Sequence, residues 1–431
     1  METCQRWNMH DVGIKVIIDL VINHTSDQHP WFQEARMSKN NPKREWYIWR
    51  DKPNNWASFF GGSAWQFDEQ TQQYYYHSFS KAQVDLNWTN PEVKAAIFDV
   101  IDFWIEKGID GFRLDVVNNL TVDIECKDNP YDESGTQIHQ YDVNQPGIIE
   151  TIKDIKAFLT SKNSQLFTAG EISSDKLEII QQYAGKELFD VTFNFNFGSV
   201  ESFDEKKIVQ ELIEMQKIYR AQRLPTLFFN SHDMSRSWNR LSQEKTSRYL
   251  QLAALLLLNR GVAFLFQGEE LGVGDYLPAD FSDIRDIQAI NKFDERRLQG
   301  DSHEESMKQA NLVNRDRSRG MIPWDTANDN SWIGYGKKNA ESDTIFTWYQ
   351  KLITLRKTYL QETECMKILE NNDGLLRYQL SGLVIIINFL PNWSPPFKLS
   401  AQHITCLKNG ELIKKQNNYY LSGYGIWIGR N

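Results

Sequence analysis

The chain has 431 residues, of which 41% are hydrophobic and 24% are charged, and this composition is typical of an ordinary globular protein. The length fits a large barrel domain with a smaller module and excludes a single small core. A net charge of −9 leaves no basic surface for nucleic acid and makes acidic polymers poor partners. Many of the 14 Trp, 17 Tyr and 24 Phe stand beside polar residues, as in sugar-binding sites, although core packing accounts for most of them.

The four cysteines are scattered without a C-x-x-C spacing, which argues against a disulfide framework and against a zinc site; they are Cys4, Cys126, Cys365 and Cys406. The first residues are polar and lack the apolar core of a secretory signal. The longest apolar stretch, around Leu252 to Leu258, is too short to span a bilayer. We therefore expect a cytoplasmic protein without a membrane partner.

The front of the chain predicts a helix over Glu2 to Val12, followed by a strand over Ile14 to His24. This strand is rich in β-branched residues and apolar on both faces, which is typical of a parallel strand buried under helices. From His29 to Tyr76 the sequence is rich in Trp, Asn, Pro and Gly. That composition predicts a loop-rich excursion domain with a few short strands.

The central stretch of the sequence is Gly108 to Asn118, where a short apolar run ends in an acid. Arg113 and Asp115 are two residues apart, so on a strand they share one face. A guanidinium keeps a neighbouring carboxylate ionised, which suits a nucleophile or a charge stabiliser, although a simple strand-end ion pair explains the pair equally well.

Helices alternate with strands six times along the chain, which predicts a parallel sheet that is either doubly wound or closed into a barrel. An irregular stretch from about Gly272 to Asn339 precedes a last helix over Thr344 to Tyr359, and residues 364–431 predict an antiparallel β-domain. The remaining predicted helices are Val93 to Lys107, Ile148 to Leu159, Lys206 to Tyr219 and Thr246 to Asn259, and the remaining strands are Leu166 to Ile172, Asp190 to Phe195, Thr226 to Asp233 and Val262 to Phe266.

Functional groups of barrel enzymes collect at the carboxyl ends of the strands. A doubly wound sheet is expected to carry a glycine-rich phosphate loop after its first strand, and none is present, so the barrel is favoured. Three acids, two histidines and an arginine at one mouth suit glycoside hydrolysis, in which one carboxylate attacks and one acid protonates the leaving oxygen. The strand ends carry Asp19, Asn23, His24, Arg113, Asp115, Glu171, His232 and Asp233.

Five stretches, in order, resemble the conserved regions of the α-amylase family, glycoside hydrolase family 13, and the likeness runs from about residue 10 to residue 360. They are Asp19 to His24, Gln83 to Trp88, Gly111 to Asp115, Gly170-Glu171 and Asn230 to Asp233. The resemblance implies Asp115 as nucleophile, Glu171 as general acid/base, Asp233 as transition-state stabiliser, His24 and His232 as ligands of sugar hydroxyls, Arg113 as the residue that orients Asp115, and Asp19 as its brace. Phe167 and Ala169 precede Glu171 in an apolar strand that is expected to raise the pKa of its carboxyl.

Other stretches resemble the oligo-1,6-glucosidase group of the family, including Asn23 to Ser26, Glu45 to Asp51, Phe60 to Trp65 and Arg315 to Arg319. Val116, directly after Asp115, matches members that prefer α-1,6 linkages. Gly170 to Ser174 and Thr192 to Phe195 are more similar to trehalose-6-phosphate hydrolases, which need a cationic cradle for the phosphate. Val84 stands where a proline is usual and Met234-Ser235 where Gln-Pro is usual, which leaves the linkage preference open.

Relative to the family, the chain begins in what resembles the second helix. We expect a (β/α)8 TIM barrel that lacks its first two strands, formed by residues 1–24 and 89–360, with the excursion domain over 25–88. The family's calcium loop lies in the lacking part, so we expect no metal site and no cofactor. Open sheet edges would then make the chain poorly soluble and nearly inactive.

The predicted function is hydrolysis of short α-glucosides with retention of configuration, with a small oligosaccharide or disaccharide as substrate. Trehalose-6-phosphate hydrolysis is the alternative within the same class. From a different class, the sequence also allows an inactive fragment or a non-catalytic amylase-like interaction protein, such as the ectodomain of an amino-acid-transporter heavy subunit. Oligomeric state is left open.

Overall fold

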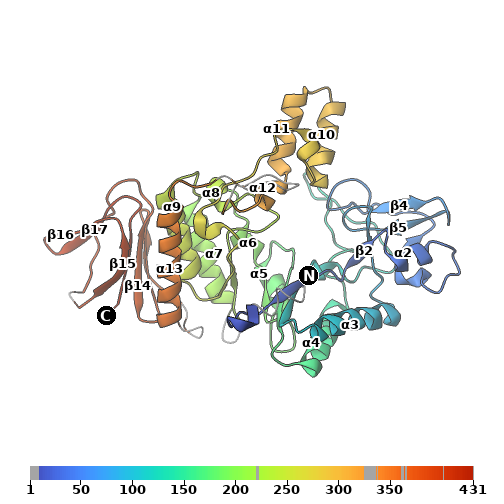
Figure 1. The fold of residues 1–431 in the computed structure, drawn as a ribbon, viewed down its shortest axis with the longest axis horizontal. Helices are drawn as coiled ribbons and strands as arrows, with labels where there is room; N and C mark the ends of the chain where they lie inside the picture. The colour runs from blue at the N-terminus through green and yellow to red at the C-terminus, as the bar shows by residue number, and fades with distance from the viewer. Residues whose placement is uncertain are drawn as a thin grey trace. The chain divides into compact units, whose positions relative to one another are not determined.

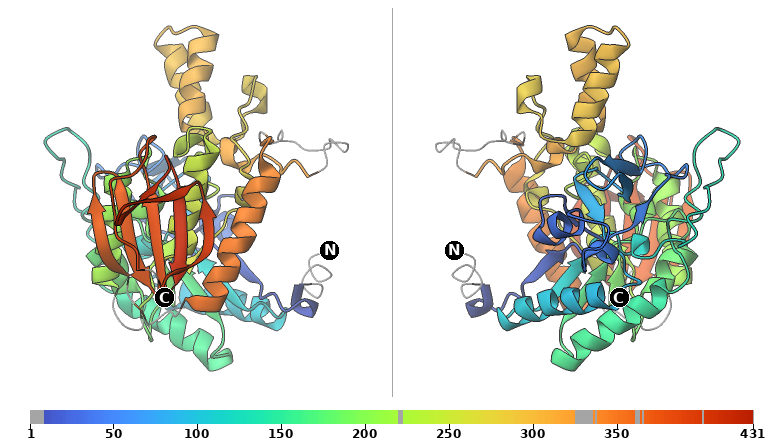
Figure 2. Two further views of the ribbon diagram at one scale, coloured as in Figure 1. Left: turned by 90° about the vertical axis from the view of Figure 1, so that its left-hand side faces the viewer. Right: turned by 90° about the vertical axis from the view of Figure 1, so that its right-hand side faces the viewer.

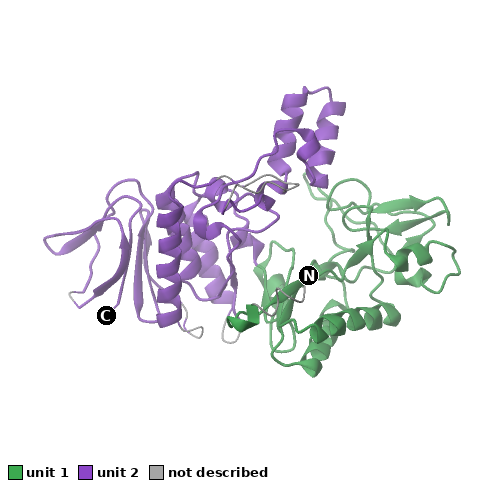
Figure 3. Cartoon of the chain, viewed as in Figure 1, with its two compact units in different colours: residues 1–193 green, residues 194–431 purple. Residues whose placement is uncertain are grey.

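The computed structural model describes residues 9–219, 223–324, 336, 338–360, 364, 366–400 and 402–430. The chain forms two compact units, residues 1–193 and residues 194–431 (Figure 3), which are taken in turn. The predicted division into three domains stays a prediction.

A four-stranded parallel sheet with the strand order β1-β7-β8-β9 is the centre of the first unit. A Cβ at Gly111 would collide with the Phe167 carbonyl oxygen, so a glycine is required where β7 meets β8. The predicted parallel pairing is confirmed, although each strand is shorter than predicted. The strands are β1 (Ile17–Leu20), β7 (Gly111–Leu114), β8 (Phe167–Gly170) and β9 (Val191–Thr192).

The prediction of one long buried strand from Ile14 to His24 was wrong. Strand β1 ends at Leu20, and His24 begins β2 (His24–Ser26), which pairs antiparallel with β6 (Gln83–Asp85). Ile14 and Val21 are 52% and 43% exposed. The reason is that β1 lies at one end of the strand order, with β7 as its neighbour.

Two helices of the first unit lie side by side, α3 (Pro91–Glu106) and α4 (Ile148–Lys162) (Figure 1). Helix α3 begins at Pro91, two residues before the predicted Val93, because the Asn90 side chain accepts a hydrogen bond from the Glu92 amide and proline occupies the first turn. Phe98 of α3 and Phe158 of α4 stack with ring centroids 4.4 Å apart.

The excursion predicted from the loop-rich composition contains α2 (Pro30–Ala35) and a small antiparallel sheet of β3 (Trp49–Arg50), β5 (Gln73–Tyr76) and β4 (Trp65–Asp68). Its core includes Trp56, Trp65 and Tyr76, and Cys126 from the segment after β7 packs into it. Val122 and Tyr141 of the same segment also pack against this core, whereas Asn118 at its start bonds to Ser173 beyond β8. Short helical turns in this unit are η1 (Arg44–Trp46), η2 (Val117–Asn119), α5 (Leu177–Ile180) and η3 (Gln181–Tyr183).

The second unit contains two parallel strands, β10 (Thr226–Leu227) and β11 (Val262–Ala263). The strands predicted up to Phe195 and Asp233 were too long, because Phe195 begins a short helix and the residues after Leu227 form turns. Residues 249–257 of α9 are all buried, as expected for a helix that is apolar on every side. The helices are α6 (Phe195–Gly198), α7 (Glu205–Ile218), α8 (Ser237–Arg240), α9 (Thr246–Leu257), α12 (Asp316–Arg319) and α13 (Ser342–Tyr359), with turns η4 (Glu269–Leu271) and η5 (Phe281–Asp283).

The stretch predicted as irregular contains a helical hairpin, α10 (Ile287–Leu298) and α11 (His303–Val313), which is the pair of antiparallel helices drawn in gold in Figures 1 and 2. Ala289 and Phe293 of α10 pack against Met307 and Ala310 of α11. Ser302 caps α11 by accepting a hydrogen bond from the Glu305 amide. The S-x-x-E pattern was the sequence signal for this helix.

The predicted C-terminal β-domain is confirmed. Five antiparallel strands have the order β12-β13-β14-β18-β15 (Figure 2). Every residue of β14 is buried, and the sheet is joined to α9 by hydrogen bonds from Tyr378 Oη to the Leu258 carbonyl and from Gln251 Nε2 to the Asn388 carbonyl. The strands are β12 (Lys367–Asn372), β13 (Leu375–Leu380), β14 (Leu383–Asn388), β15 (Ile404–Asn409) and β18 (Ile426–Arg430), beside a hairpin of β16 (Leu412–Lys415) and β17 (Asn418–Leu421).

Among the described residues, no helix has the length and apolarity to cross a membrane. The same part of the chain holds no cluster of three or more His, Cys, Asp or Glu side chains arranged for a metal ion. Cys126 and Cys406 are free thiols. Cys4, Cys365 and most of the helix predicted over Glu2 to Val12 lie outside the described residues.

Candidate active site

In the first unit one arginine contacts three carboxylates. Arg113 Nη1 lies 2.8 and 2.9 Å from the two carboxylate oxygens of Asp19 and 2.5 Å from Asp115 Oδ1. Its other terminal nitrogen, Nη2, forms an ion pair with Glu171 Oε2. The side chains of Arg113, Asp115 and Glu171 are 15%, 20% and 14% exposed, whereas Asp19 is about half exposed.

Strand register explains this convergence. Asp19 pairs with Arg113 across β1 and β7, and Leu114 pairs with Gly170 across β7 and β8. Asp115 and Glu171 are therefore the first residues beyond two neighbouring strands, and the Glu171 amide donates to the Leu114 carbonyl at 2.9 Å. Neighbouring strands lie about 4.8 Å apart, so the two acids emerge side by side.

The predicted apolar environment of Glu171 was wrong. Ala169 and Gly170 are buried as expected, but the Glu171 side chain points to the Arg113 guanidinium. The two-residue periodicity that places Arg113 and Asp115 on one face says nothing about side chains on the next strand, which is why the sequence did not reveal this ion pair.

Val116, directly after Asp115, has φ 43° and ψ 45°, in the left-handed region. This conformation is a genuine outlier for a β-branched residue, and it costs about 1–3 kcal/mol, which the surrounding structure must offset. The turn directs the chain into η2 immediately after the acid. Such strain is concentrated at functional sites.

His24 lies in a buried polar network of the same unit. Its Nε2 is 3.0 Å from Gln83 Nε2, and its Nδ1 is 3.4 Å from Asn23 Nδ2. Asn23 also donates to Asp85 Oδ2 at 3.0 Å. Burial lowers the pKa of His24 to about 4, so the imidazole is neutral at pH 7 and suited to hydrogen bonds with hydroxyl groups.

In the second unit Asp233 is the common partner of two arginines and a histidine. Asp233 Oδ2 lies 3.1 Å from His232 Nε2, and its Oδ1 lies 2.9 Å from Arg319 Nη2 and 3.4 Å from Arg315 Nη1. Arg315 is itself held by the fully buried Asp286, with Nη2 2.6 Å from Oδ1.

Burial alone would raise the pKa of Asp233, but the hydrogen bond from His232 and the positive charges of His232, Arg315 and Arg319 outweigh it and lower the pKa to about 2. Asp233 is therefore a carboxylate over the whole range in which proteins work. A permanently charged acid is suited to stabilising positive charge in a transition state.

Hydrogen bonds of Asn230 and Asp275 hold the turn that carries Asp233. Asn230 donates to Ser237 Oγ at 2.9 Å and accepts from the Ser237 amide at 2.5 Å. Asp275 accepts from Ser235 Oγ at 2.6 Å and from the Arg236 amide at 2.7 Å. These bonds close residues 230–237 into one rigid turn.

The structure thus divides the predicted residues into two sets. On the first unit it brings together Asp19, Arg113, Asp115 and Glu171, and it places His24 on β2 rather than at the end of a parallel strand. On the second unit it joins His232 and Asp233. The contacts of Arg315 and Arg319 with Asp233 were missed, although the sequence signal was present in the stretch Arg315 to Arg319.

Comparison with known proteins agrees with these features. The family model described as the catalytic domain of α-amylase matches residues 2–364. The oligo-1,6-glucosidase of Halalkalibacterium halodurans is 34% identical over 427 residues, which cover 88% of this chain and 75% of that protein. The trehalose-6-phosphate hydrolase of Bacillus subtilis is 33% identical over 422 residues, covering 88% and 74%.

The crystal structure of Bacillus licheniformis trehalose-6-phosphate hydrolase resembles the chain with a TM-score of 0.85 and 28% identity, covering 99% of this chain and 85% of that chain. The likeness assigns a TIM barrel with a C-terminal β-domain and excludes the doubly wound alternative. The lack of two strands and the poor solubility and low activity expected from it stay predictions, and measurable hydrolysis by the full chain would contradict the expected low activity.

Proposed function

Since the chain belongs to the α-amylase family, glycoside hydrolase family 13, and is a glycoside hydrolase, we propose that it is a retaining α-glucosidase that cleaves α-1,6 linkages of short isomalto-oligosaccharides. The observation that carries the proposal is the convergence of Asp115 and Glu171 on Arg113 at the ends of two neighbouring strands. Two carboxyl groups side by side are the minimum set for glycoside hydrolysis.

In the proposed mechanism Asp115 attacks the anomeric carbon while Glu171 protonates the departing oxygen. Glu171 then takes a proton from water, which opens the glucosyl ester on Asp115 and releases glucose with its configuration retained. This requires the two carboxyl groups to lie about 5–5.5 Å apart. Because Glu171 must carry a proton before it can act as an acid, we expect its ion pair with Arg113 to be broken when substrate binds.

The other assigned residues bind the sugar, stabilise the transition state or position Asp115. We assign to Asp233 the stabilisation of the oxocarbenium-like transition state, supported by its low pKa. We assign to His24 and His232 hydrogen bonds with hydroxyls of the glucosyl unit that is released. Arg113 keeps Asp115 oriented, and Asp19 braces Arg113 through two hydrogen bonds.

The linkage preference rests on Val116 and on the relatives that carry the oligo-1,6-glucosidase name. The left-handed turn at Val116 fixes a branched side chain directly beside the proposed nucleophile. We propose that this side chain shapes the site around the leaving group and favours the flexible α-1,6 linkage over the α-1,4 linkage.

Trehalose-6-phosphate hydrolysis is the second candidate. It is supported by the curated relative and the solved structure of that name and by the stretch Gly170 to Ser174. Ser173 is held to the segment after β7, because Asn118 Nδ2 donates to its carbonyl at 3.1 Å and its amide donates to Asn118 Oδ1 at 3.3 Å.

The two candidates are separated by measuring kcat/KM of the full chain on isomaltose, maltose, sucrose and trehalose-6-phosphate. We expect isomaltose to be the best substrate, with maltose at least about tenfold worse, the discrimination that a single apolar contact supplies. Asp115→Asn is the control and should abolish all activity. Equal rates on maltose and isomaltose, or cleavage of trehalose-6-phosphate alone, would overturn the linkage assignment.

A further inference from the structure

A chain of ring contacts leads to His24 on the first unit. The ring of Phe79 lies 5.8 Å from the His24 ring, and Phe59 lies 5.5 Å from Phe79 in a stacked arrangement. Phe59 is 38% exposed, so part of its ring is open to solvent and accessible to a ligand. Since a sugar presents apolar faces as well as hydroxyls, these two rings and His24 form what we call the aromatic wall.

The wall is supported from the segment that follows the proposed nucleophile. His139 stacks on Phe59 with ring centroids 4.2 Å apart and an angle of 22° between the planes. This is the closest approach within the chain of rings that leads to His24. Offset-stacked rings restrain one another, and such pairs contribute about 0.5–1.5 kcal/mol beyond the area they bury.

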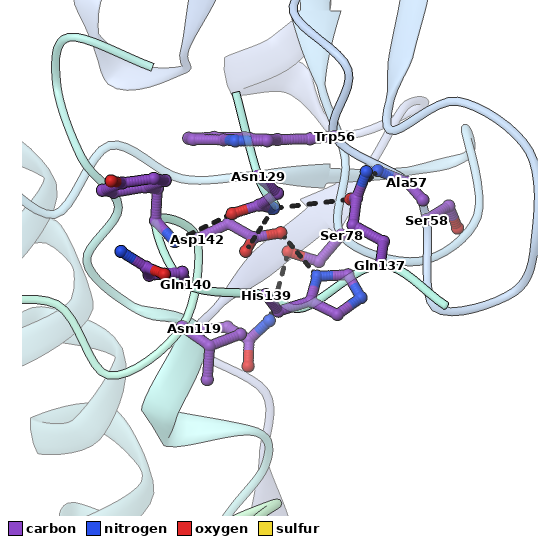
Figure 4. Close-up of polar contacts among 12 residues, drawn as sticks. Trp56, Ala57, Ser58, Ser78, Asn119, Asn129, Gln137, His139, Gln140 and Asp142 are labelled. Atoms are coloured by element: carbon purple, nitrogen blue, oxygen red, sulfur yellow. Dashed lines mark hydrogen bonds and ion pairs between the residues drawn. The ribbon is translucent and has the colours of Figure 1, made fainter. Parts of the chain in front are cut away.

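The orientation of His139 is set by a buried acid. Its Nδ1 lies 2.7 Å from Asp142 Oδ2, and the Asp142 side chain is only 1% exposed (Figure 4). The other carboxylate oxygen accepts a hydrogen bond from Asn129 Nδ2 at 2.9 Å. A carboxylate only accepts, so Nδ1 carries the hydrogen, and this fixes the plane of the imidazole against Phe59.

Asn129 in turn ties this segment to the strand-linking loop that carries Phe59. The Asn129 amide donates to Asn55 Oδ1, and Asn55 Nδ2 donates to the Asn129 carbonyl, both at 2.8 Å. Gln137 accepts from the Ala57 amide and donates to the Asn55 carbonyl, also at 2.8 Å. The segment that carries His139 and the loop that carries Phe59 are therefore joined by hydrogen bonds.

We propose that His139 is a positioning residue for substrate binding: held by Asp142 and Asn129, its ring backs Phe59 and so sets the aromatic wall against which the glucosyl unit packs. The inference rests on the proposed function. A wall that contacts the sugar equally in the ground state and in the transition state changes KM and leaves kcat nearly constant. A residue that only stabilises the fold would change the melting temperature and leave KM alone.

Two variants of the full chain separate the ring from its hydrogen bond. His139→Asn keeps an N–H donor for Asp142 but removes the ring, so the KM for isomaltose should rise about 2- to 10-fold, with kcat changed less than about twofold. His139→Phe keeps the ring but leaves the buried Asp142 Oδ2 without its donor, so the melting temperature should fall while KM stays near that of the wild type.

His29→Asn is the matched control. The His29 ring packs on Trp31 at 4.7 Å, and its Nδ1 accepts from the Trp31 amide at the start of α2, a capping role that asparagine retains. This variant also loses a histidine–aromatic contact in the same unit, but its KM should be unchanged.

If the wild type is active, a KM that is unaltered in H139N, or that is tenfold higher in H139F, would overturn the inference. Either result would leave the proposed function standing. The H139F result does not depend on the folding of H139N. A wild-type chain that cleaves none of the glucosides would overturn the proposed function and the inference with it.

Discussion

Arg113 offsets part of the negative charge of three acids that lie close together. Asp19, Asp115 and Glu171 would repel one another without it, and each of the three contacts a terminal nitrogen of its guanidinium. A lysine offers one compact charge rather than a planar fork, so it could not hold three carboxylates in this geometry. The position therefore demands arginine on electrostatic and on geometric grounds.

Replacing this arginine should disable the enzyme without unfolding it. For Arg113→Gln we expect kcat on isomaltose to fall by at least about 100-fold, the loss caused by removing one preorganised electrostatic partner. Asp19→Asn is the matched control, because Asp19 is about half exposed and touches Arg113 alone of the cluster, and it should cost less than about tenfold. An R113Q enzyme within tenfold of the wild type would contradict the roles assigned to this cluster.

Among secondary-structure elements, the pairing of β2 with β6 buries an acid. Asp85, the last residue of β6, accepts from the Ser78 amide at 2.9 Å, from Ser78 Oγ at 2.5 Å and from Asn23 Nδ2 at 3.0 Å. Burial raises its pKa to about 7 despite these hydrogen bonds. Through Asp85, Asn23 beside His24 is thus joined to Ser78 of the excursion.

This shift predicts a pH dependence of stability. An unfolded Asp85 titrates near 3.8, so between pH 4 and pH 7 the folded state binds the additional proton, and stability falls as the pH rises through this window. The difference in unfolding free energy between the wild type and Asp85→Asn should therefore decrease by up to about 4 kcal/mol from pH 4 to pH 7, measured by urea unfolding.

Asp110 provides a control of opposite sign. Burial alone would raise its pKa, but hydrogen bonds from the Val16 amide, His10 and Lys15 lower it below the usual value. Its stabilising effect is present above pH 4 and is lost on acidification. The unfolding free energy of the wild type minus that of Asp110→Asn should then increase as the pH rises through about 4. A decrease for both variants would contradict the assignment.

Strand ends could be predicted from the sequence, whereas contacts between side chains of different elements could not. The placement of Asp19, Arg113, Asp115 and Glu171 at the ends of strands followed from the sequence, because an apolar run that ends in charged residues is a local pattern. The ion pair between Arg113 and Glu171 did not follow, since it joins side chains of different strands. The α10–α11 hairpin was missed because its few apolar contacts, such as Phe293 on Met307, give a weak helical period.

For the molecule as a whole, the family and the fold rest on the motifs, the parallel strands and the relatives together. The acids assigned to catalysis come from both compact units, Asp115 and Glu171 from the first and Asp233 from the second. Each set has its own partners, Arg113 in one and His232, Arg315 and Arg319 in the other.

Proton NMR of isomaltose hydrolysis by the full chain tests the central claim most directly. A retaining α-1,6-glucosidase that uses Asp115 and Glu171 releases the cleaved non-reducing unit as α-glucose, while the reducing-end unit leaves as the anomeric mixture already present in isomaltose. Asp115→Asn should give no glucose under the same conditions. An early excess of β-glucose over the share that the reducing-end unit supplies, or hydrolysis that survives in D115N, would contradict the account.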